Sequence, residues 1–154
     1  IMVEAAKHDG TALVEVLQNC VIFNDRTHSI ISDRDVRADR TIVLQHGKPM
    51  IFGKNKDKGL ILDGMRLKAV TIGENGITTD DLLVHNAEEQ NHGIHIMLCE
   101  MEWPELPVAL GIIRRVKDRT YDDMVRDQVT ELANKSNIRC MNDMLRSGDT
   151  WVVE

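Results

Sequence analysis

The amino-acid sequence predicts an α/β fold: the final helix-strand step of a doubly wound parallel sheet, followed by an α+β C-terminal extension with antiparallel hairpins. Three observations lead to this prediction. Residues 1–9 have helical spacing and run through Gly10 into the β-rich residues 11–17. Short apolar runs separated by glycine-containing turns follow between residues 41 and 70, as in hairpins. Helical patterns then return at 91–102 and from Thr120 onward.

The first step predicts a strand that this chain alone does not complete. Met2, Ala5 and Ala6 form the inner face of the helix, and Gly10 ends it in a left-handed conformation. A parallel strand at 11–17 that is buried on both faces needs neighbouring strands. The rest of the sequence has too few helix-strand alternations to supply them. We therefore expect the chain to be part of a larger subunit, with more sequence upstream of Ile1.

Residues 26–40 alternate positive and negative side chains and show little apolar periodicity. We interpret them as a charged connector, either solvated or folded as a short exposed helix, with a partner-docking surface as the alternative. The extension then begins at residue 41. Two hairpins are predicted in it, each with a glycine in the turn: 41–45 with 49–52 around His46-Gly47-Lys48, and 60–62 with 65–70 around Asp63-Gly64.

The last third of the chain predicts helices and one more strand. A helix is expected at 91–102 and a strand at 108–113. Thr120 is placed to cap the backbone amide of Asp123 at the start of the clearest helix. A short helix at 138–145 and an apolar tail, Trp151-Val152-Val153, which we expect to pack against other protein surface, complete the pattern.

The composition excludes several classes of function. The chain has 154 residues, of which 42% are hydrophobic, and a net charge of −6, so it is an acidic globular protein. Nucleic-acid binders and proteins of anionic membranes present basic surfaces, and we therefore expect neither activity. No apolar run approaches the roughly 20 residues that span a bilayer, which makes the cytoplasm the expected location.

Cys20 is the candidate that the sequence singles out. The chain has three cysteines, Cys20, Cys99 and Cys140, an odd number without a Cys-x-x-Cys pair, which argues against a disulfide framework. Cys20 comes just after the predicted strand, at the edge where α/β sheets bind cofactors. The apolar residues Val21, Ile22 and Phe23 follow it and are suited to excluding water from a bound group.

The stretch Gln18-Asn19-Cys20-Val21-Ile22-Phe23-Asn24-Asp25 resembles the end of the thiamine-diphosphate domain in the β subunit of 2-oxoacid:ferredoxin oxidoreductases, in the form found in 2-oxoglutarate-specific members. The resemblance spans most of the chain. It also includes His46-Gly47-Lys48-Pro49-Met50-Ile51-Phe52-Gly53 and, more loosely, residues 81–85 and 104–111. It implies three regions: residues 1–25 ending the thiamine-diphosphate-binding domain, the connector 26–40, and the extension 41–154.

In that family the matching cysteine is the last of four thiolates on a 4Fe-4S cluster, and Cys20 inherits this role by resemblance. Asn19, Val21, Ile22 and Phe23 would form the shell around the cluster, with backbone amides of residues 19–22 donating to its sulfur atoms. The sequence lacks the family's Gly-Asp-Gly...Asn signature. Thiamine diphosphate and Mg²⁺ would therefore be bound mainly by the upstream part, which would also supply the other three thiolates, and no catalytic residue is assigned in this chain.

The resemblance implies coenzyme A-dependent decarboxylation of 2-oxoglutarate to succinyl-CoA, or the reverse carboxylation, with electrons passing to ferredoxin. The implied partners are the upstream part of the same subunit, an α subunit and ferredoxin, in an α2β2 assembly. Two alternatives stay open: an enzyme for pyruvate or another 2-oxoacid, and a non-catalytic interaction domain without a cluster. The physiological direction of the reaction is not encoded in any motif that we identify.

Three histidines suggest a further site. His92 and His95 have the i, i+3 spacing with which a helix can bind zinc, and His85 lies nearby in the sequence. Helical His-x-x-His pairs are common by chance, and no carboxylate base accompanies this one. Surface or interface histidines are therefore the favoured interpretation, with metal binding as the alternative.

Overall fold

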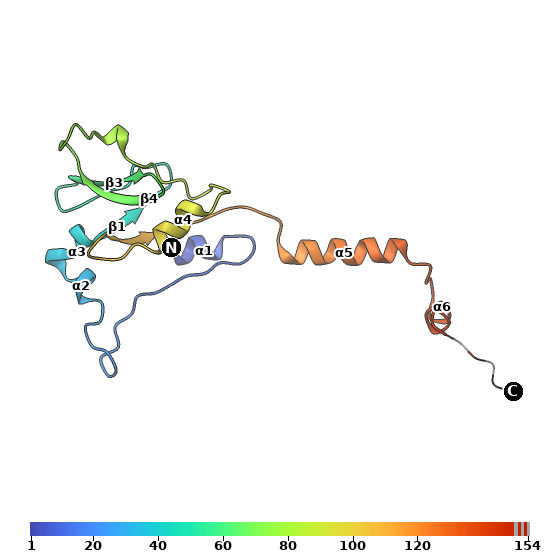
Figure 1. Ribbon diagram of the computed structural model, residues 1–154. Coiled ribbons are helices and arrows are strands. Elements are labelled where there is room, and N and C mark those ends of the chain that lie inside the picture. The colour runs from blue at the N-terminus through green and yellow to red at the C-terminus, as the bar shows by residue number, and fades with distance from the viewer. Residues whose placement is uncertain (150, 152, 154) are drawn as a thin grey trace. The chain divides into compact units, whose positions relative to one another are not determined.

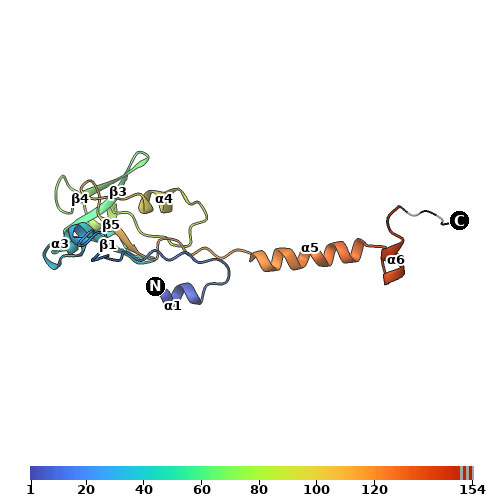
Figure 2. The ribbon, with the colours of Figure 1, turned by 90° about the horizontal axis from the view of Figure 1, so that it is seen from below.

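The structure is a computed structural model that describes residues 1–149, 151 and 153. It divides into two units, one containing residues 1–8 and 12–117, and the other containing residues 9–11 and the chain from Asp118 onward (Figures 1 and 2). The α/β class is confirmed, because a parallel strand pair and an antiparallel sheet both occur. The division into 1–25, 26–40 and 41–154 stays a prediction.

The N-terminal helix is confirmed, but the strand expected after it does not form within this chain. Helix α1 spans Met2–Ala6, and Gly10 has a φ of +109°. Residues 11–19 form no helix or strand. Leu13 is 95% exposed and Val16 is 68% exposed. The physical reason is that β-propensity alone does not make a strand, and no described residue pairs with this segment.

The first unit is built around a parallel pair formed by β1 (Thr41–Leu44) and β5 (Val108–Gly111). Thr41 lies beside Val108 and Leu44 beside Gly111. The side chains of Ile42 and Leu44 are buried while Val43 points to solvent, as the period of two requires. The predicted hairpin between 41–45 and 49–52 is therefore wrong. The turn at Gly47 forms, with the amide of Lys48 donating to the carbonyl of Gln45, but β1 pairs with β5 instead.

An antiparallel sheet contains β2 (Ile51–Phe52), β3 (Lys58–Asp63) and β4 (Arg66–Thr71), in that order. The hairpin predicted around Gly64 is confirmed, with Asp63 opposite Arg66 and a φ of +63° at Gly64. A further turn follows β4, where the amide of Ile77 donates to the carbonyl of Glu74.

Short helices connect these sheets. The connector folds as α2 (Ser29–Ser32) and α3 (Arg34–Arg40), neither of which has a buried residue. A 3-10 turn, η1 (Thr79–Asp81), begins with a capping box between Thr78 and Asp81, and α4 spans Gly93–Cys99. The hydrophobic core lies between β1, the antiparallel sheet and α4; its buried members are Ile42, Leu44, Met50, Phe52, Leu60, Leu98 and Met101.

The second unit contains α5 (Tyr121–Lys135) and α6 (Met141–Leu145). The predicted cap of α5 is confirmed, because the Thr120 hydroxyl accepts a hydrogen bond from the amide of Asp123. Neither helix has a buried residue. Trp151 and Val153 are exposed, and Val152 of the predicted tail lies outside the described residues. None of the described helices is long and apolar enough to cross a membrane.

Gly111 offers a test of the β1–β5 pairing. It has a φ of +106°, and a Cβ atom there would lie 2.7 Å from the carbonyl oxygen of Leu44. We expect Gly111→Ala to lower the free energy of unfolding by at least about 3 kcal/mol, because backbone strain and a steric clash add. Urea denaturation measures this change.

Gly64→Ala is the matched control. Gly64 also has a positive φ, but a Cβ atom there would meet nothing within 4 Å. Its cost should be that of the left-handed conformation alone, about 1 to 2 kcal/mol. Equal losses in the two variants would show that close packing of Gly111 on Leu44 contributes nothing.

Candidate functional site

Cys20 begins a tight turn that is closed by its own backbone. The amide of Asn24 donates to the carbonyl of Cys20 at 2.9 Å, and these two residues form an isolated antiparallel bridge. Val21, Ile22 and Phe23 form the turn between them. The loop therefore holds its shape without a neighbouring strand.

Polar side chains fix both ends of this loop. The side-chain amide of Asn19 donates to the carboxylate of Asp25 at 2.9 Å, and that of Asn24 donates to the Thr27 hydroxyl at 3.0 Å. Arg26 adopts a φ of +58°, and its guanidinium pairs with Asp33 at 3.2 Å. The bracketing polar residues of the motif thus hold the turn that presents the thiol.

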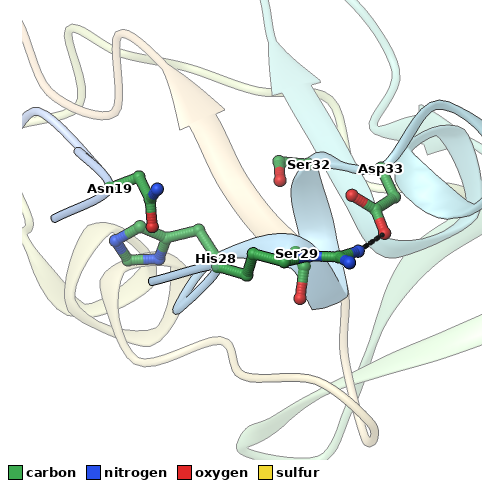
Figure 3. A pocket seen from close by; sticks show the side chains of 6 residues that line it. Asn19, His28, Ser29, Ser32 and Asp33 are labelled. Atoms are coloured by element: carbon green, nitrogen blue, oxygen red, sulfur yellow. Dashed lines mark hydrogen bonds and ion pairs between the residues drawn. The ribbon is translucent and has the colours of Figure 1, made fainter. Parts of the chain in front are cut away.

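A polar recess lies next to the loop. Figure 3 shows Asn19, His28, Ser29, Ser32 and Asp33 around it, and Arg26 completes its lining. Asn19, which was predicted to belong to the cluster shell, therefore takes part in two features: the hydrogen bond to Asp25 and the wall of this recess.

The backbone of the turn favours the thiolate form of Cys20. The N–H of Phe23, followed by those of Ile22 and Asn24, lowers the pKa of the Cys20 thiol below its ordinary value. Desolvation raises the pKa by more than the Asn24 amide lowers it, but by less than the amide of Phe23 or of Ile22 lowers it. The thiolate is the form that binds metals. Cys20 is therefore suited to be a metal ligand, and the donation of the amides of residues 19–22 to the sulfur atoms of a cluster stays a prediction.

The apolar shell is present but open to solvent. Val21, Ile22 and Phe23 are 75%, 82% and 90% exposed. Within this chain they do not shield the thiol from water. Their expected role in lowering the dielectric around a cluster requires cover from other protein surface and stays a prediction.

The described residues supply one thiolate and no complete metal site. Cys99 and Cys140 are exposed, and nowhere in the described part of the chain do three or more His, Cys, Asp or Glu side chains gather as metal ligands. One thiolate cannot hold a 4Fe-4S cluster, which is bound by four. The residues present thus fit a single ligand of a shared cluster.

The histidines are arranged differently from the surface arrangement expected. His85 and His95 are buried, whereas His92 is exposed at the start of α4. The Nε2 atoms of His85 and His95 bond the carbonyls of Ile112 and Asn86, both at 2.9 Å. His92 and His95 therefore do not converge on a zinc ion. The signal that sequence reasoning missed is the apolar run Leu82-Leu83-Val84 directly before His85.

The Cys20 turn makes a prediction about thiol reactivity. In iron-free protein, the rate of alkylation by iodoacetamide should reach half its maximum at a lower pH in the folded state than in urea, because the turn stabilises the thiolate. Mass spectrometry of the Cys20 peptide measures this rate. Phe23→Pro removes the most important N–H and should raise the midpoint, while Phe23→Ala keeps the N–H and serves as the control. The same midpoint in folded and unfolded protein would refute the role of the amides.

Comparison with known proteins finds a similar curated protein. No family model matches the sequence, and no solved structure matches it. A curated protein does: the 2-oxoglutarate oxidoreductase subunit KorB of Mycobacterium tuberculosis is 32% identical over 153 residues. The aligned region covers 97% of this chain and 40% of KorB, so the chain spans well under half the length of that relative. Along almost its whole length, the chain is thus similar to part of a 2-oxoglutarate oxidoreductase subunit, which confirms the resemblance to the β subunits of 2-oxoacid:ferredoxin oxidoreductases.

Proposed function

We propose that this chain is the C-terminal part of the β subunit of a 2-oxoglutarate:ferredoxin oxidoreductase and provides one thiolate, Cys20, to a 4Fe-4S cluster. The observation that carries the proposal is the similarity to KorB across 97% of the chain, which includes the Cys20 loop. The lowered pKa of the exposed Cys20 thiol supports it, because a cluster ligand must be deprotonated.

The reaction proposed for the complete enzyme is the coenzyme A-dependent oxidative decarboxylation of 2-oxoglutarate to succinyl-CoA, or the reverse carboxylation. When bound, thiamine diphosphate with Mg²⁺ supplies the carbon chemistry and the cluster supplies one-electron transfer to ferredoxin. The upstream part of the subunit would bind thiamine diphosphate and provide the other three thiolates.

The tasks of this chain are those of a ligand and its support. Cys20 would hold iron through its sulfur, and the amides of Phe23, Ile22 and Asn24 would keep negative charge on that sulfur. Asn19 and Asn24 anchor the two ends of the turn through the side chains of Asp25 and Thr27. Val21, Ile22 and Phe23 would exclude water once the rest of the subunit covers them.

The proposal includes the surroundings of the enzyme. The partners are an α subunit, the upstream part of the β subunit and ferredoxin, in a cytoplasmic α2β2 assembly. The connector helices α2 and α3 and the exposed apolar face of α5 remain available for such contacts, since α5 exposes Val129 and Leu132 at 61% each.

Replacing Cys20 tests the proposed ligand. In the intact subunit, Cys20→Ala should abolish ferredoxin reduction and sharply reduce the iron content and the cluster absorbance, because three thiolates remain for four positions. Iron and sulfide analysis, together with turnover, measures the effect.

Cys99→Ala and Cys140→Ala are matched controls, because both thiols are exposed and lie outside the loop. They should keep the cluster and the activity. A Cys20→Ala enzyme with normal cluster signal and turnover would exclude the assignment. An intact wild-type subunit without iron or sulfide would instead favour a non-catalytic interaction domain.

The choice of substrate is tested by comparing 2-oxoglutarate with pyruvate. We expect kcat/KM to be at least about tenfold higher for 2-oxoglutarate, the factor that corresponds to about 1.4 kcal/mol of transition-state binding. The form of the Cys20 loop and the name of KorB both favour this substrate. A preference for pyruvate would place the enzyme with the pyruvate-oxidising members, while leaving the role of Cys20 unchanged.

A further inference from the structure

We propose that His46, His85 and His95 form a pH-sensitive clasp that holds residues 85–90 closed at neutral pH and releases this segment on acidification. The clasp lies in the extension, away from Cys20 in the sequence, and plays no part in the proposed cluster chemistry. It is carried by two hydrogen bonds that His46 and His95 accept on an unprotonated Nδ1, and by the buried Nδ1 of His85, which has no acceptor for a proton among the described residues.

His85 is the buried centre of the clasp. The residue is 1% exposed, and its Nε2 lies 2.9 Å from the carbonyl oxygen of Ile112, to which it donates. Its Nδ1 is buried and has no hydrogen-bond partner among the residues that the structure describes. Protonating Nδ1 would bury a charged N–H without an acceptor, which is costly. His85 therefore belongs in the neutral form while the segment is closed.

His95 has hydrogen-bond partners on both of its ring nitrogens. Its Nε2 donates to the carbonyl of Asn86 at 2.9 Å, and its Nδ1 lies 2.9 Å from a guanidinium nitrogen of Arg114. Arginine has only donors, so Nδ1 of His95 must be the acceptor. A proton on this atom would replace an attraction with a repulsion.

His46 also needs an unprotonated Nδ1 to keep its hydrogen bond with the segment. Its Nδ1 accepts a hydrogen bond from the amide of Ala87 at 3.2 Å. A protonated Nδ1 would confront this N–H with a second donor and break the bond. Nδ1 thus accepts a hydrogen bond in His46, from the turn after β1, and in His95, from α4. In His85, from the segment itself, Nδ1 is buried without a partner among the described residues.

The charged groups around the clasp mostly oppose protonation. Burial lowers the pKa of His85, the hydrogen bond to the Ile112 carbonyl raises it, and the nearby His95 and His46 lower it again. Arg114 adds a positive charge in contact with His95. Glu88 is the acidic group near His46 and attracts positive charge there. The Glu88 carboxylate already pairs with Arg115 at 2.9 Å, and the charge of Lys117 also acts on this carboxylate. Glu4 lies on the far side of Arg115 at 3.9 Å.

The direction of the pH effect follows from the lowered pKa of His85. The neutral form is favoured in the closed state, so the stabilisation is complete above the unfolded pKa of about 6.5 and is lost as the pH falls below it. Opening would also free the two hydrogen bonds from Arg114 to the carbonyls of Glu89 and Gln90, at 2.7 and 3.2 Å. The segment and the exit of β5 would loosen together.

Amide hydrogen exchange of the full-length protein tests the clasp. Three amides report on it: Gly47, which donates to His85; Ala87, which donates to His46; and Arg115, which donates to Ala87. Between about pH 7.5 and about pH 5.5, and after correction for intrinsic rates, opening of these bonds should increase by up to about tenfold, because the lowered pKa of His85 favours the open segment over this range. The amide of Leu60 in the core should not follow, which separates local opening from unfolding.

Three substitutions remove the ring nitrogens while keeping an acceptor toward Ala87 and Arg114 and a donor toward Ile112; the bond from His95 to the Asn86 carbonyl is lost. His46→Asn and His95→Asn place an acceptor oxygen near the position of Nδ1, and His85→Gln keeps a donor toward Ile112. The combined variant should lose the pH dependence, while His92→Asn, at an exposed position, should keep it. An unchanged exchange rate in wild type at the lower pH, or the same increase in the combined variant, would overturn the clasp.

A second measurement covers the case in which the combined variant does not fold. The ring signals of His85 in the wild-type protein, followed by NMR, should titrate at a lower pH than in urea. Titration of His85 at the same pH in both states would also overturn the proposal.

Discussion

The pairing of β1 with β5 is the constraint on which the first unit depends. It joins residues far apart in the sequence, with the backbone of Leu44 packed against Gly111 so closely that no Cβ fits between them. On one side of this pair, Ile42 and Leu44 enter the core. At its end, the two strands deliver the turn with His46 and the residues Ile112 and Arg114, which hold residues 85–90. The β1–β5 pair therefore positions both the hydrophobic core and the groups that hold residues 85–90.

Sequence reasoning succeeded where a structure is determined by neighbours in the chain. The hairpin around Gly64, the cap of α5 by Thr120 and the left-handed Gly10 each follow from a few adjacent residues. It failed where strands had to choose partners. Residues 41–52 contain two strands and a real turn, but alternation of buried and exposed side chains encodes burial and not the identity of the neighbouring strand. The same limit explains residues 11–17, whose β-propensity finds no partner among the described strands.

In the candidate site, too, features set by neighbouring residues were predicted and features set by distant residues were not. The loop motif identified Cys20 and its polar brackets, and the hydrogen bonds of Asn19 and Asn24 follow naturally from so short a turn. Which amides face the Cys20 sulfur depends on the turn geometry, which places those of residues 22–24 there and which the motif alone does not give. The burial of His85 and His95 was not predicted, because spacing on one helix reveals nothing about Ile112 or Arg114, which reach these histidines from the segment that follows β5.

A cluster ligand needs a correctly oriented thiolate and apolar surroundings, and the Cys20 loop provides only the first by itself. Its geometry and its thiolate character are local, since the bond from Asn24 to Cys20 and the amides of the turn need no other part of the protein. Its apolar surroundings are not, since Val21, Ile22 and Phe23 remain open to solvent in a chain that spans 40% of its relative. Under the proposed function, this chain would orient and ionise the sulfur, whereas the reduction potential would be adjusted when the remainder of the subunit covers the loop and changes the dielectric around it.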